Sequence, residues 1–542
     1  MLKKIIFSTV ACALISFPAF ANNLQLNHFD LYASEASAHR MTFTLDIRQD
    51  NSWRSAASHD AVWIFMKYST DAGQTWHHAS MGGIGLNPSG FASPQGFEIL
   101  VPADMKGFFF RRADILTGAL DAKAVHFVWN YAQDGISDDT ANAANTLTKV
   151  FGLEMVYIPE GAFFAGDGAS ASPFRFKQGS ADDSPWYISS ENAITTTNTA
   201  SAGFYYQSTG ASGENLSGDV FLVPNSFPKG YKAFYLMKYE LTEGEWTEFF
   251  NALSAAAKAT RDITASLNGG KNSTGVVDRN TVAWDPVYPS RPAVTMRPSR
   301  AMSYISWPDA AAYADWAGLR PMTELEFEKA ARGVDVNSVT DEFAWGSASY
   351  SAATADQIFP ANQDENGTEA VLNGAANLNR NALGWTSGDG RPGGAAEGQK
   401  GPLRAGIFAE NSTARVTSGG GYYGAMELSG NLAEPAVTVG RAEGRQFLGS
   451  HGDGELSTIS GHEGNATNVD WPGIDVSDAR RGVDRTLGIG YRGGDFQSAS
   501  IRDFQVSARS FAAKDPDSAG FKQRHDASSG IYYGARLART AP

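Results

Sequence analysis

Short apolar runs separated by turn-forming residues dominate the first part of the chain. Residues 61–66 (AVWIFM), 97–101 (FEILV) and 124–129 (AVHFVW) are rich in β-branched and aromatic side chains, and Gly, Pro, Asn and Asp cluster between them. Such runs are typical of strands in an antiparallel sheet. We therefore predict a small β-sandwich domain over residues 22–150.

Helix signals enter only after residue 150. Residues 242–245 (TEGE) and 323–326 (TELE) match capping boxes, in which a threonine caps the third helical amide and a glutamate reaches back. Ser306 is placed to begin a third helix, and Gly333 to end the second one. The remainder is rich in Gly, Ser and Asn, which favours irregular structure. The chain is therefore predicted to be α+β, with a second domain over residues 151–542.

The first residues have the order of a secretory signal peptide. Two lysines precede an apolar stretch over residues 5–17, and Ala19-Phe20-Ala21 follows. We expect cleavage near Ala21 and export to the periplasm, the cell surface or the extracellular space. A lipoprotein signal that uses Cys12 is the alternative, which Thr9 disfavours because an aliphatic residue is preferred there. Past this segment, no apolar run reaches the length of a membrane span.

Composition removes several classes of function. Cys12 is the single cysteine, so cleavage would leave no disulfide, no thiolate metal site and no thiol nucleophile. The net charge of −14 argues against nucleic acid as a partner.

One block of sequence resembles a known family. Residues 320–333 (RPMTELEFEKAARG) are similar to the Arg-Leu-Pro-Thr-Glu-Ala-Glu-Trp-Glu signature of the formylglycine-generating enzymes, also called sulfatase-modifying factors. Further blocks follow the family order, at residues 155–163, 237–242, 426–434, 492–496 and 533–537. The resemblance spans residues 151–542, with insertions near 167–228 and 334–424. It implies a variant of the C-type lectin fold with little regular secondary structure.

The resemblance also implies which chemistry is missing. Enzymes of this family bind copper(I) through two cysteines beyond the Arg-Gly-Gly block, because soft thiolates suit that ion. The matching positions are Ser498 and Asp503, and Asp495 replaces the family serine after the two glycines. We therefore expect neither copper nor formylglycine-generating activity.

Calcium is the metal that the resemblance favours. The family block near residue 430 binds a structural calcium, and the matching ligands are Glu427, the carbonyls of Gly430 and Leu432, and Glu434. Glu427 stands where an asparagine is usual. The alternative is that these groups only brace the loop.

A second family calcium site begins at an asparagine that matches Asn362. Some relatives instead hold non-haem iron through histidines. The nearest cluster of that type here is His451, Asp453 and His462, for which a plain hydrogen-bonded loop is the favoured interpretation.

These observations favour a binding protein that displays a C-terminal surface to a protein or glycan ligand. Aromatic and small polar residues gather there, as in adaptable recognition loops. The predicted ligand-binding surface consists of Asp495, Phe496, Gln497, Ser498, Ser500, Arg502, Asp503, Phe504, Gln505, Tyr532 and Tyr533. Some variable proteins of diversity-generating retroelements have this fold. A sharper hypothesis is that the chain is one of these variable proteins.

Two alternatives stay open. One is an enzyme of altered chemistry, with non-haem iron or another route, that acts on thiol or sulfatase-like substrates. The other is a structural surface component in which residues 22–150 dock to other proteins.

Overall fold

The structure is a computed structural model of the chain. It describes residues 23–168, 174–178, 184–199, 203–208, 216–285, 292–353, 358–360, 369–371, 376–380, 401–409, 414–512, 524–526 and 531–542. The predicted signal peptide at residues 1–21 lies outside the described residues, as do parts of both predicted insertions. Within the described ranges, none of the helices has the length and apolar character that a membrane crossing requires.

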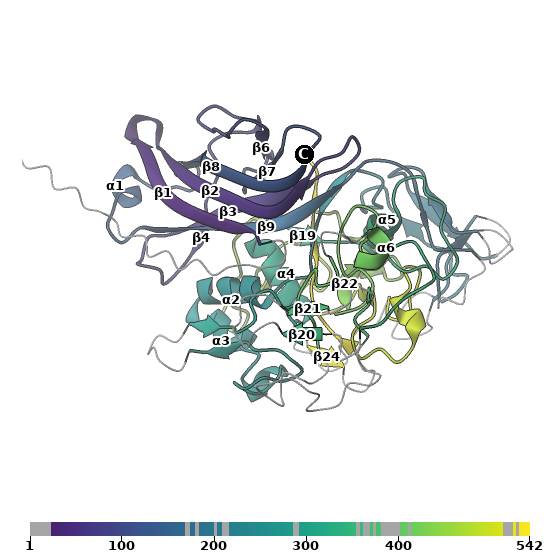
Figure 1. Cartoon of the computed structure of the whole chain (residues 1–542). Helices are drawn as coiled ribbons and strands as arrows, with labels where there is room; N and C mark the ends of the chain where they lie inside the picture. Colours follow the sequence, from purple (N-terminus) through teal and green to yellow (C-terminus); the bar gives the residue numbers. More distant parts are fainter. Residues whose placement is uncertain are drawn as a thin grey trace, which may run out of the picture.

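Two antiparallel sheets form the N-terminal part (Figure 1). The first has three strands in the order β1-β2-β8, which are β1 (Gln25–Glu35), β2 (Arg40–Trp53) and β8 (Thr117–Asn130). The second has nine strands in the order β19-β26-β16-β9-β3-β7-β6-β5, with β4 beside β3. Its N-terminal members are β3 (Asp60–Ser69), β4 (His77–His78), β5 (Gly85–Leu86), β6 (Phe97–Val101) and β7 (Phe108–Arg112).

Strand β3 is buried on both faces, which explains its unbroken apolar run. Ile64 and its even-numbered neighbours belong to an apolar cluster shared with the three-stranded sheet. In that cluster the rings of Phe108 and Phe127 lie 5.3 Å apart and join the two sheets. Phe65 points to the opposite face, where its ring meets Trp316 at 5.1 Å. A strand that packs on two sides has no position for a polar, solvated side chain.

The predicted domain boundary at residue 150 lies inside a strand. Strand β9 (Leu147–Ile158) pairs with β3 over its length, from Ser69 opposite Leu147 to Asp60 opposite Val156. On its other edge β9 pairs with β16 (Phe234–Met237), which pairs with β26 (Leu537–Thr540), and β26 pairs with β19 (Arg320–Pro321). The N-terminal strands and the C-terminal part therefore share one sheet.

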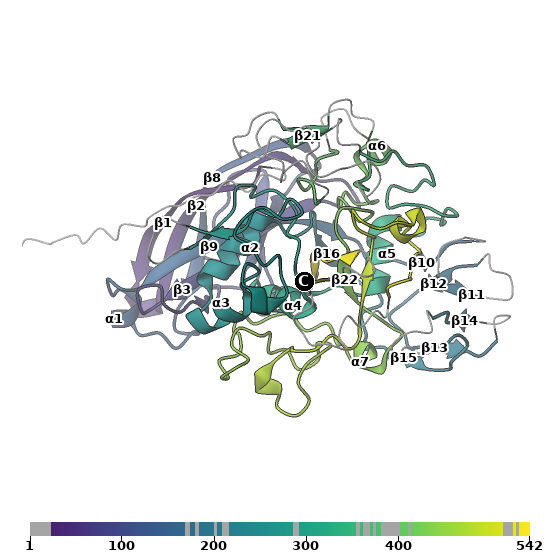
Figure 2. The same cartoon turned by 90° about the horizontal axis from the view of Figure 1, so that it is seen from below.

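Three of the four longer helices lie against the face of the nine-stranded sheet that Phe65 occupies (Figures 1 and 2). The last of them packs against the opposite face, where its Phe327 belongs to an apolar cluster with Val156 and Leu236. The longer helices are α2 (Glu243–Ala252), α3 (Ala255–Arg261), α4 (Trp307–Trp316) and α5 (Glu324–Arg332), and shorter turns are α1 (Asp138–Ala141), α6 (Arg415–Ser418) and α7 (Ala442–Arg445). Thr242 and Thr323 form the predicted capping boxes, and Ser306 forms another with Asp309. Gly333 ends α5 with φ of 101°, as predicted.

The remaining strands are short and separated by loops. They are β10 (Phe163–Ala165), β11 (Lys177–Gln178), β12 (Trp186–Ile188), β13 (Ile194–Thr197), β14 (Phe204–Tyr205), β15 (Leu222–Val223), β17 (Ala283–Trp284), β18 (Ala293–Val294), β20 (Ile358–Pro360), β21 (Glu369–Val371), β22 (Glu434–Val437), β23 (Ile489–Arg492), β24 (His525–Asp526) and β25 (Ile531–Tyr532). This architecture agrees with the predicted α+β class and its irregular second part. The β-sandwich and C-type lectin assignments stay predictions.

Candidate functional site

Asp495 is the centre of the candidate site. Strand β23 leads into Gly493 and Gly494, which have φ values of 90° and 68°, and this double left-handed turn directs the chain inward. The buried carboxylate of Asp495 accepts hydrogen bonds from Gln497 N at 2.7 Å and from Ser498 Oγ at 2.9 Å. Burial raises the pKa of Asp495 to about 7, although these hydrogen bonds favour its ionised form. The carboxyl group can therefore gain or lose a proton near neutral pH.

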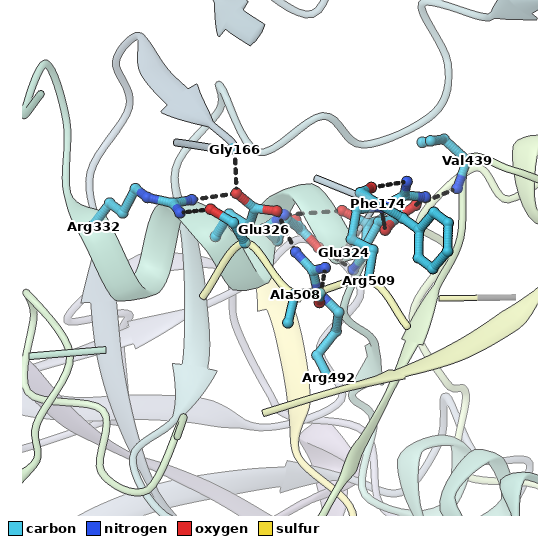
Figure 3. Close-up of polar contacts among 12 residues, drawn as sticks. Gly166, Phe174, Glu324, Glu326, Arg332, Val439, Arg492, Ala508 and Arg509 are labelled. Carbon is cyan, nitrogen blue, oxygen red and sulfur yellow. Dashed lines mark hydrogen bonds and ion pairs between the residues drawn. The ribbon is translucent and has the colours of Figure 1, made fainter. Parts of the chain in front are cut away.

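Helix α5 holds the segment that carries Asp495 (Figure 3). Arg492 is ion-paired with Glu328 and donates from Nη1 to the carbonyl of Ala508 at 2.6 Å. Arg509 donates from Nε to Glu324 Oε2 at 2.8 Å. Because the charged groups of these pairs are buried on both sides, the segment 492–509 is fixed at two points. The family signature block thus positions the candidate site.

Further ion pairs continue along the same helix. Arg332 bonds Glu328 and, at 2.5 Å, Glu342, while Arg320 donates to Glu326 Oε1 at 2.6 Å. All of these side chains are buried. Buried arginines paired in this way stabilise one arrangement of the surrounding loops, because an unpaired buried charge is costly.

Aromatic side chains cover one side of Asp495. Tyr532 donates its backbone N–H to Asp495, and its ring lies 4.8 Å from that of Phe496. Its hydroxyl bonds Asp278, which also accepts from the Tyr304 hydroxyl at 2.6 Å. Burial, followed by the charge of Asp278, raises the pKa of both tyrosines. Both phenols therefore stay protonated and act as donors.

The two positions that match the family cysteines hold side chains with oxygen atoms in place of sulfur. The hydroxyl of Ser498 is bonded to Asp495, and Asp503 accepts from Ser510 Oγ at 3.3 Å within the short 3₁₀ turn Ile501–Phe504. Burial raises the pKa of Asp503, and the nearby Arg380 partly opposes this. Neither side chain offers the soft sulfur that copper(I) prefers, so the residues at this place do not fit that ion.

Most residues of the predicted ligand-binding surface are buried in the structure and are not exposed to solvent. The buried residues are Asp495, Phe496, Ser498, Phe504, Gln505, Tyr532 and Tyr533. Gln497 and Asp503 are half-buried, and only Ser500 and Arg502 are exposed. Most of the predicted residues therefore lie inside the fold, and Ser500 and Arg502 are the ones that reach the surface.

Asp278 and Tyr304 were missed by sequence reasoning. Tyr304 has a φ of 65° and Asp278 a φ of 44°, but neither residue stands in a recognisable motif. The ring of His525 lies 5.1 Å from that of Tyr304. Their contact with Tyr532 depends on chain segments that are far apart in sequence.

The predicted calcium ligands are buried together. Glu427 accepts from Gly406 N at 2.9 Å through Oε1, and Glu434 accepts from Arg536 Nε at 2.7 Å through Oε1. The second oxygen of each carboxylate is buried and has no hydrogen-bond partner within the described ranges. Burial raises the pKa of each of the two carboxyl groups to about 7. Orphaned hard oxygens of this kind fit a calcium ion.

The rest of a calcium shell would come from the backbone. No three side chains of metal-binding type converge in the part of the chain that the structure describes. The carbonyls of Gly430 and Leu432 are the ligands that the resemblance adds. Asn362 lies outside the described residues.

The three residues of the predicted iron cluster have separate partners. His451 accepts from Thr540 N at 3.0 Å and lies 3.4 Å from Asp104, and burial lowers its pKa to about 4. His462 lies 3.4 Å from Asp484, while Asp453 accepts from the backbone of the same loop. The structure does not bring the three side chains together.

Comparison with known proteins finds similarity to one family over part of the chain. Residues 189–434 match the model described as a sulfatase-modifying factor enzyme 1-like domain. The chain is 33% identical over 128 residues to the formylglycine-generating enzyme of Bos taurus, which covers 21% of this chain and 33% of that protein. It is 43% identical over 157 residues to the formylglycine-generating enzyme of Streptomyces coelicolor, which covers 24% and 49%.

A third relative has another activity. The hercynine oxygenase of Mycolicibacterium smegmatis is 37% identical over 95 residues, which is 17% of this chain and 22% of that protein. The chain spans half or less of the length of each of these relatives. The family match ends at residue 434, before the segment that carries Asp495 and Ser498.

Proposed function

Because the chain belongs, through residues 189–434, to the sulfatase-modifying factor family, we propose that it is an exported ligand-binding protein without formylglycine-generating chemistry. One observation carries this proposal. At the family cysteine positions the chain has Ser498 and Asp503, and the Ser498 hydroxyl is held by the Asp495 carboxylate. Hard oxygen groups closed into their own hydrogen bonds supply neither a copper(I) ligand nor a thiol.

The groups around Asp495 suit recognition of a protein or glycan. Asp278 is a half-buried carboxylate that accepts from two phenols, and the half-buried Gln497 also bonds the side chain of Tyr532. Aromatic faces next to fixed polar groups are typical of binding sites for such ligands. The net charge of −14 disfavours nucleic acid.

Restoring the thiols tests the chemical half of the proposal. We expect the exported protein to take up no copper(I) and to leave the cysteine of a sulfatase-motif peptide unchanged. The double variant Ser498→Cys/Asp503→Cys should gain copper(I) binding, whereas the exposed pair Ser500→Cys/Arg502→Cys serves as the control. Formylglycine produced by the unaltered protein would overturn the proposal.

Array binding tests the recognition half. The protein without residues 1–21 is applied to glycan and peptide arrays, and any signal is compared with that of Asp278→Asn. We expect Asp278→Asn to lose the signal and the exposed control Asp139→Asn to keep it. Equal signals from both variants would place recognition elsewhere on the chain.

Calcium is the ion that we propose for the scaffold. Glu427, Glu434 and the carbonyls of Gly430 and Leu432 would hold it, and its charge would neutralise the buried carboxylates. The orphaned oxygens of Glu427 and Glu434 support this assignment.

A second candidate is an enzyme of altered chemistry acting on thiol or sulfatase-like substrates. The pKa of about 7 at Asp495 favours it, because a buried carboxyl group that titrates near neutrality suits general acid–base catalysis. The hercynine oxygenase relative supports the idea that the family scaffold carries more than one chemistry. Oxygen uptake with thiol substrates, measured together with iron content, distinguishes this candidate from a binding protein.

Export and sequence diversification need their own tests. Cell fractionation checks whether the protein leaves the cytoplasm. Sequencing the region that encodes residues 485–542 across a growing population checks the retroelement hypothesis. Because Phe504 and Tyr532 are buried, variation that spares them and alters Ser500 or Arg502 is the pattern that the packing allows.

A further inference from the structure

A buried lysine lies beside two carboxylates at the ends of three neighbouring strands. Asp60 begins β3, Glu154 lies on β9, and Lys238 directly follows β16 on the other edge of β9. Lys238 Nζ lies 3.5 Å from Asp60 Oδ2 and 4.0 Å from Glu154 Oε2. Asp60, Glu154 and Lys238 are only 1%, 8% and 6% exposed, so water has little access to the three groups.

Strand pairing brings these three side chains together. In the antiparallel pair of β3 and β9, Asp60 lies opposite Val156, two positions from Glu154. Residues at such diagonal positions share one face of the sheet, within reach of long side chains. Lys238 N donates to the Glu154 carbonyl at 2.8 Å, which fixes the lysine beside that glutamate. The contact therefore depends on the backbone of the shared sheet and not on a loop.

The two oxygens of the Asp60 carboxyl group have different surroundings. Oδ1 accepts hydrogen bonds from Ser52 Oγ and from Trp53 N, both at 2.9 Å. Oδ2 instead faces the Lys238 amine. Two donors on one oxygen can stabilise the negative charge that this oxygen gains when a nucleophile attacks the carboxyl carbon. Oδ2 is then the oxygen that can leave.

The three groups are not arranged as a tight ion pair. Charge-assisted hydrogen bonds are about 2.7–2.9 Å long, which is shorter than both distances from Lys238 Nζ. Burial raises the pKa of Asp60, and the charge of Lys238 opposes this. Burial lowers the pKa of Lys238, but Tyr239 and the two carboxylates together raise it. The amine therefore needs a base that takes its proton before it can act as a nucleophile, and Glu154 lies within reach.

We propose that Lys238 and Asp60 are joined by an isopeptide bond, which the folded chain forms by itself, and that Glu154 transfers the protons. Lys238 Nζ attacks Asp60 Cγ, so that a bond between Nζ and Cγ forms and the bond between Cγ and Oδ2 breaks. Two protons pass from Nζ through the Glu154 carboxylate to Oδ2, which leaves as water. One proton stays on the amide nitrogen, and Glu154 returns to its starting form. The step is a condensation and needs neither an oxidant nor a reductant.

Such a bond would supply a covalent link that thiols cannot supply in this chain. Cys12 is the single cysteine, so an internal disulfide is impossible. An amide between Asp60 and Lys238 would connect the start of β3 to the end of β16. Covalent links between positions far apart in sequence stabilise a fold by restricting the unfolded chain. This role is separate from ligand binding at the candidate site.

Mass spectrometry of the purified protein under denaturing conditions tests the proposal, because an ion pair separates there and an amide does not. We expect an intact mass that is lower by one water molecule than the mass calculated from the sequence of the same chain. Trypsin should not cleave after an acylated Lys238. The tryptic peptides 55–67 and 233–258 should therefore appear as one joined species.

Variants assign the role of each group. Lys238→Met and Asp60→Ala remove one reactant each and should have their full calculated masses. Glu154→Gln keeps both reactants and nearly the same volume, and it should also stay unjoined because proton transfer is lost. Lys329→Met is the control, since this buried lysine bonds the backbone carbonyl of Tyr231 at 3.0 Å, and this variant should keep the joined peptides.

The unaltered protein gives the decisive result, so the test does not depend on whether a variant folds. A folded, unaltered protein with its full calculated mass and with tryptic cleavage after Lys238 would overturn the proposal. The three groups would then be a buried ion-pair cluster. Joined peptides in Glu154→Gln would overturn the role of Glu154 and leave the bond itself established.

Discussion

Arg509 donates from Nε to Glu324 Oε2 at 2.8 Å, across 185 positions of sequence. Both side chains are fully buried, and Glu324 also accepts from Val439 N at 2.9 Å. The first turn of α5 thereby fixes the end of the segment that carries Asp495. Together with the pair Arg492–Glu328, this ion pair links the stability of the fold to the shape of the candidate site.

Breaking the pair should cost more than losing its attraction. In Arg509→Ala the carboxylate of Glu324 stays buried without its guanidinium, which should lower the free energy of unfolding by about 3–5 kcal/mol. Urea denaturation measures the change. Arg480→Ala, which removes an exposed pair with Asp478, is the control and should change little. A small effect of Arg509→Ala would mean that the segment is held elsewhere.

Asp495 should make the protein less stable as pH rises. Its pKa is raised from 3.8 to about 7 in the folded state, so between these values the folded protein holds a proton that the unfolded chain has lost. Stability therefore falls from about pH 4 to about pH 7 and levels off above. This contribution is absent in Asp495→Asn. As the pH rises over the same range, the melting temperature of the variant should therefore increase relative to that of the unaltered protein. Parallel pH profiles would contradict the assignment.

Lys67 should act in the opposite direction. Its buried ammonium donates to the carbonyl of Gly454 at 3.0 Å and lies 5.1 Å from the Trp316 ring. Burial lowers its pKa from 10.5 to about 7, so between these values the unfolded chain binds the extra proton and stability rises with pH.

Lys67→Met removes this dependence. The melting temperature of the variant should exceed that of the unaltered protein most near pH 6. This difference in melting temperature should shrink as the pH approaches 10. Melting temperatures at pH 6, 8 and 10 measure it, with the exposed Lys123→Met as control. The neighbouring charges that enter the profile are Glu455, Asp315, Lys106 and Asp453. A constant difference across pH would show that Lys67 stays charged in the folded protein.

The shared sheet predicts a single unfolding transition. Ile64 packs toward the three-stranded sheet and Phe65 toward the helices, on opposite faces of β3. Ile64→Ala and Phe65→Ala should each lower the free energy of unfolding, by about 2–5 and about 3–5 kcal/mol respectively, because each leaves a cavity. Calorimetry should show one transition that shifts in both variants. Two transitions, each sensitive to one substitution, would show independent domains.

Local features of the fold were predictable from sequence. The capping boxes at Thr242 and Thr323 depend on groups three residues apart, so the pattern alone specifies them. The apolar run at residues 61–66 predicted a strand in the same way. The boundary at residue 150 was a poorer prediction, because nothing local shows that β9 pairs on both edges with strands from different parts of the chain.

The features of the candidate site also divide into those that the sequence determines and those that depend on the tertiary structure. The sequence by itself determined that Cys12 is the single cysteine and that Ser498 and Asp503 stand at the family thiol positions, because residue identity and spacing are properties of the chain. Only the tertiary structure decided that Asp278 bonds Tyr304 and Tyr532, that Lys238 faces Asp60, and that His451 and His462 lie apart. These relationships join distant segments, and which segments meet depends on how the sheet orders its strands and how the loops pack upon it.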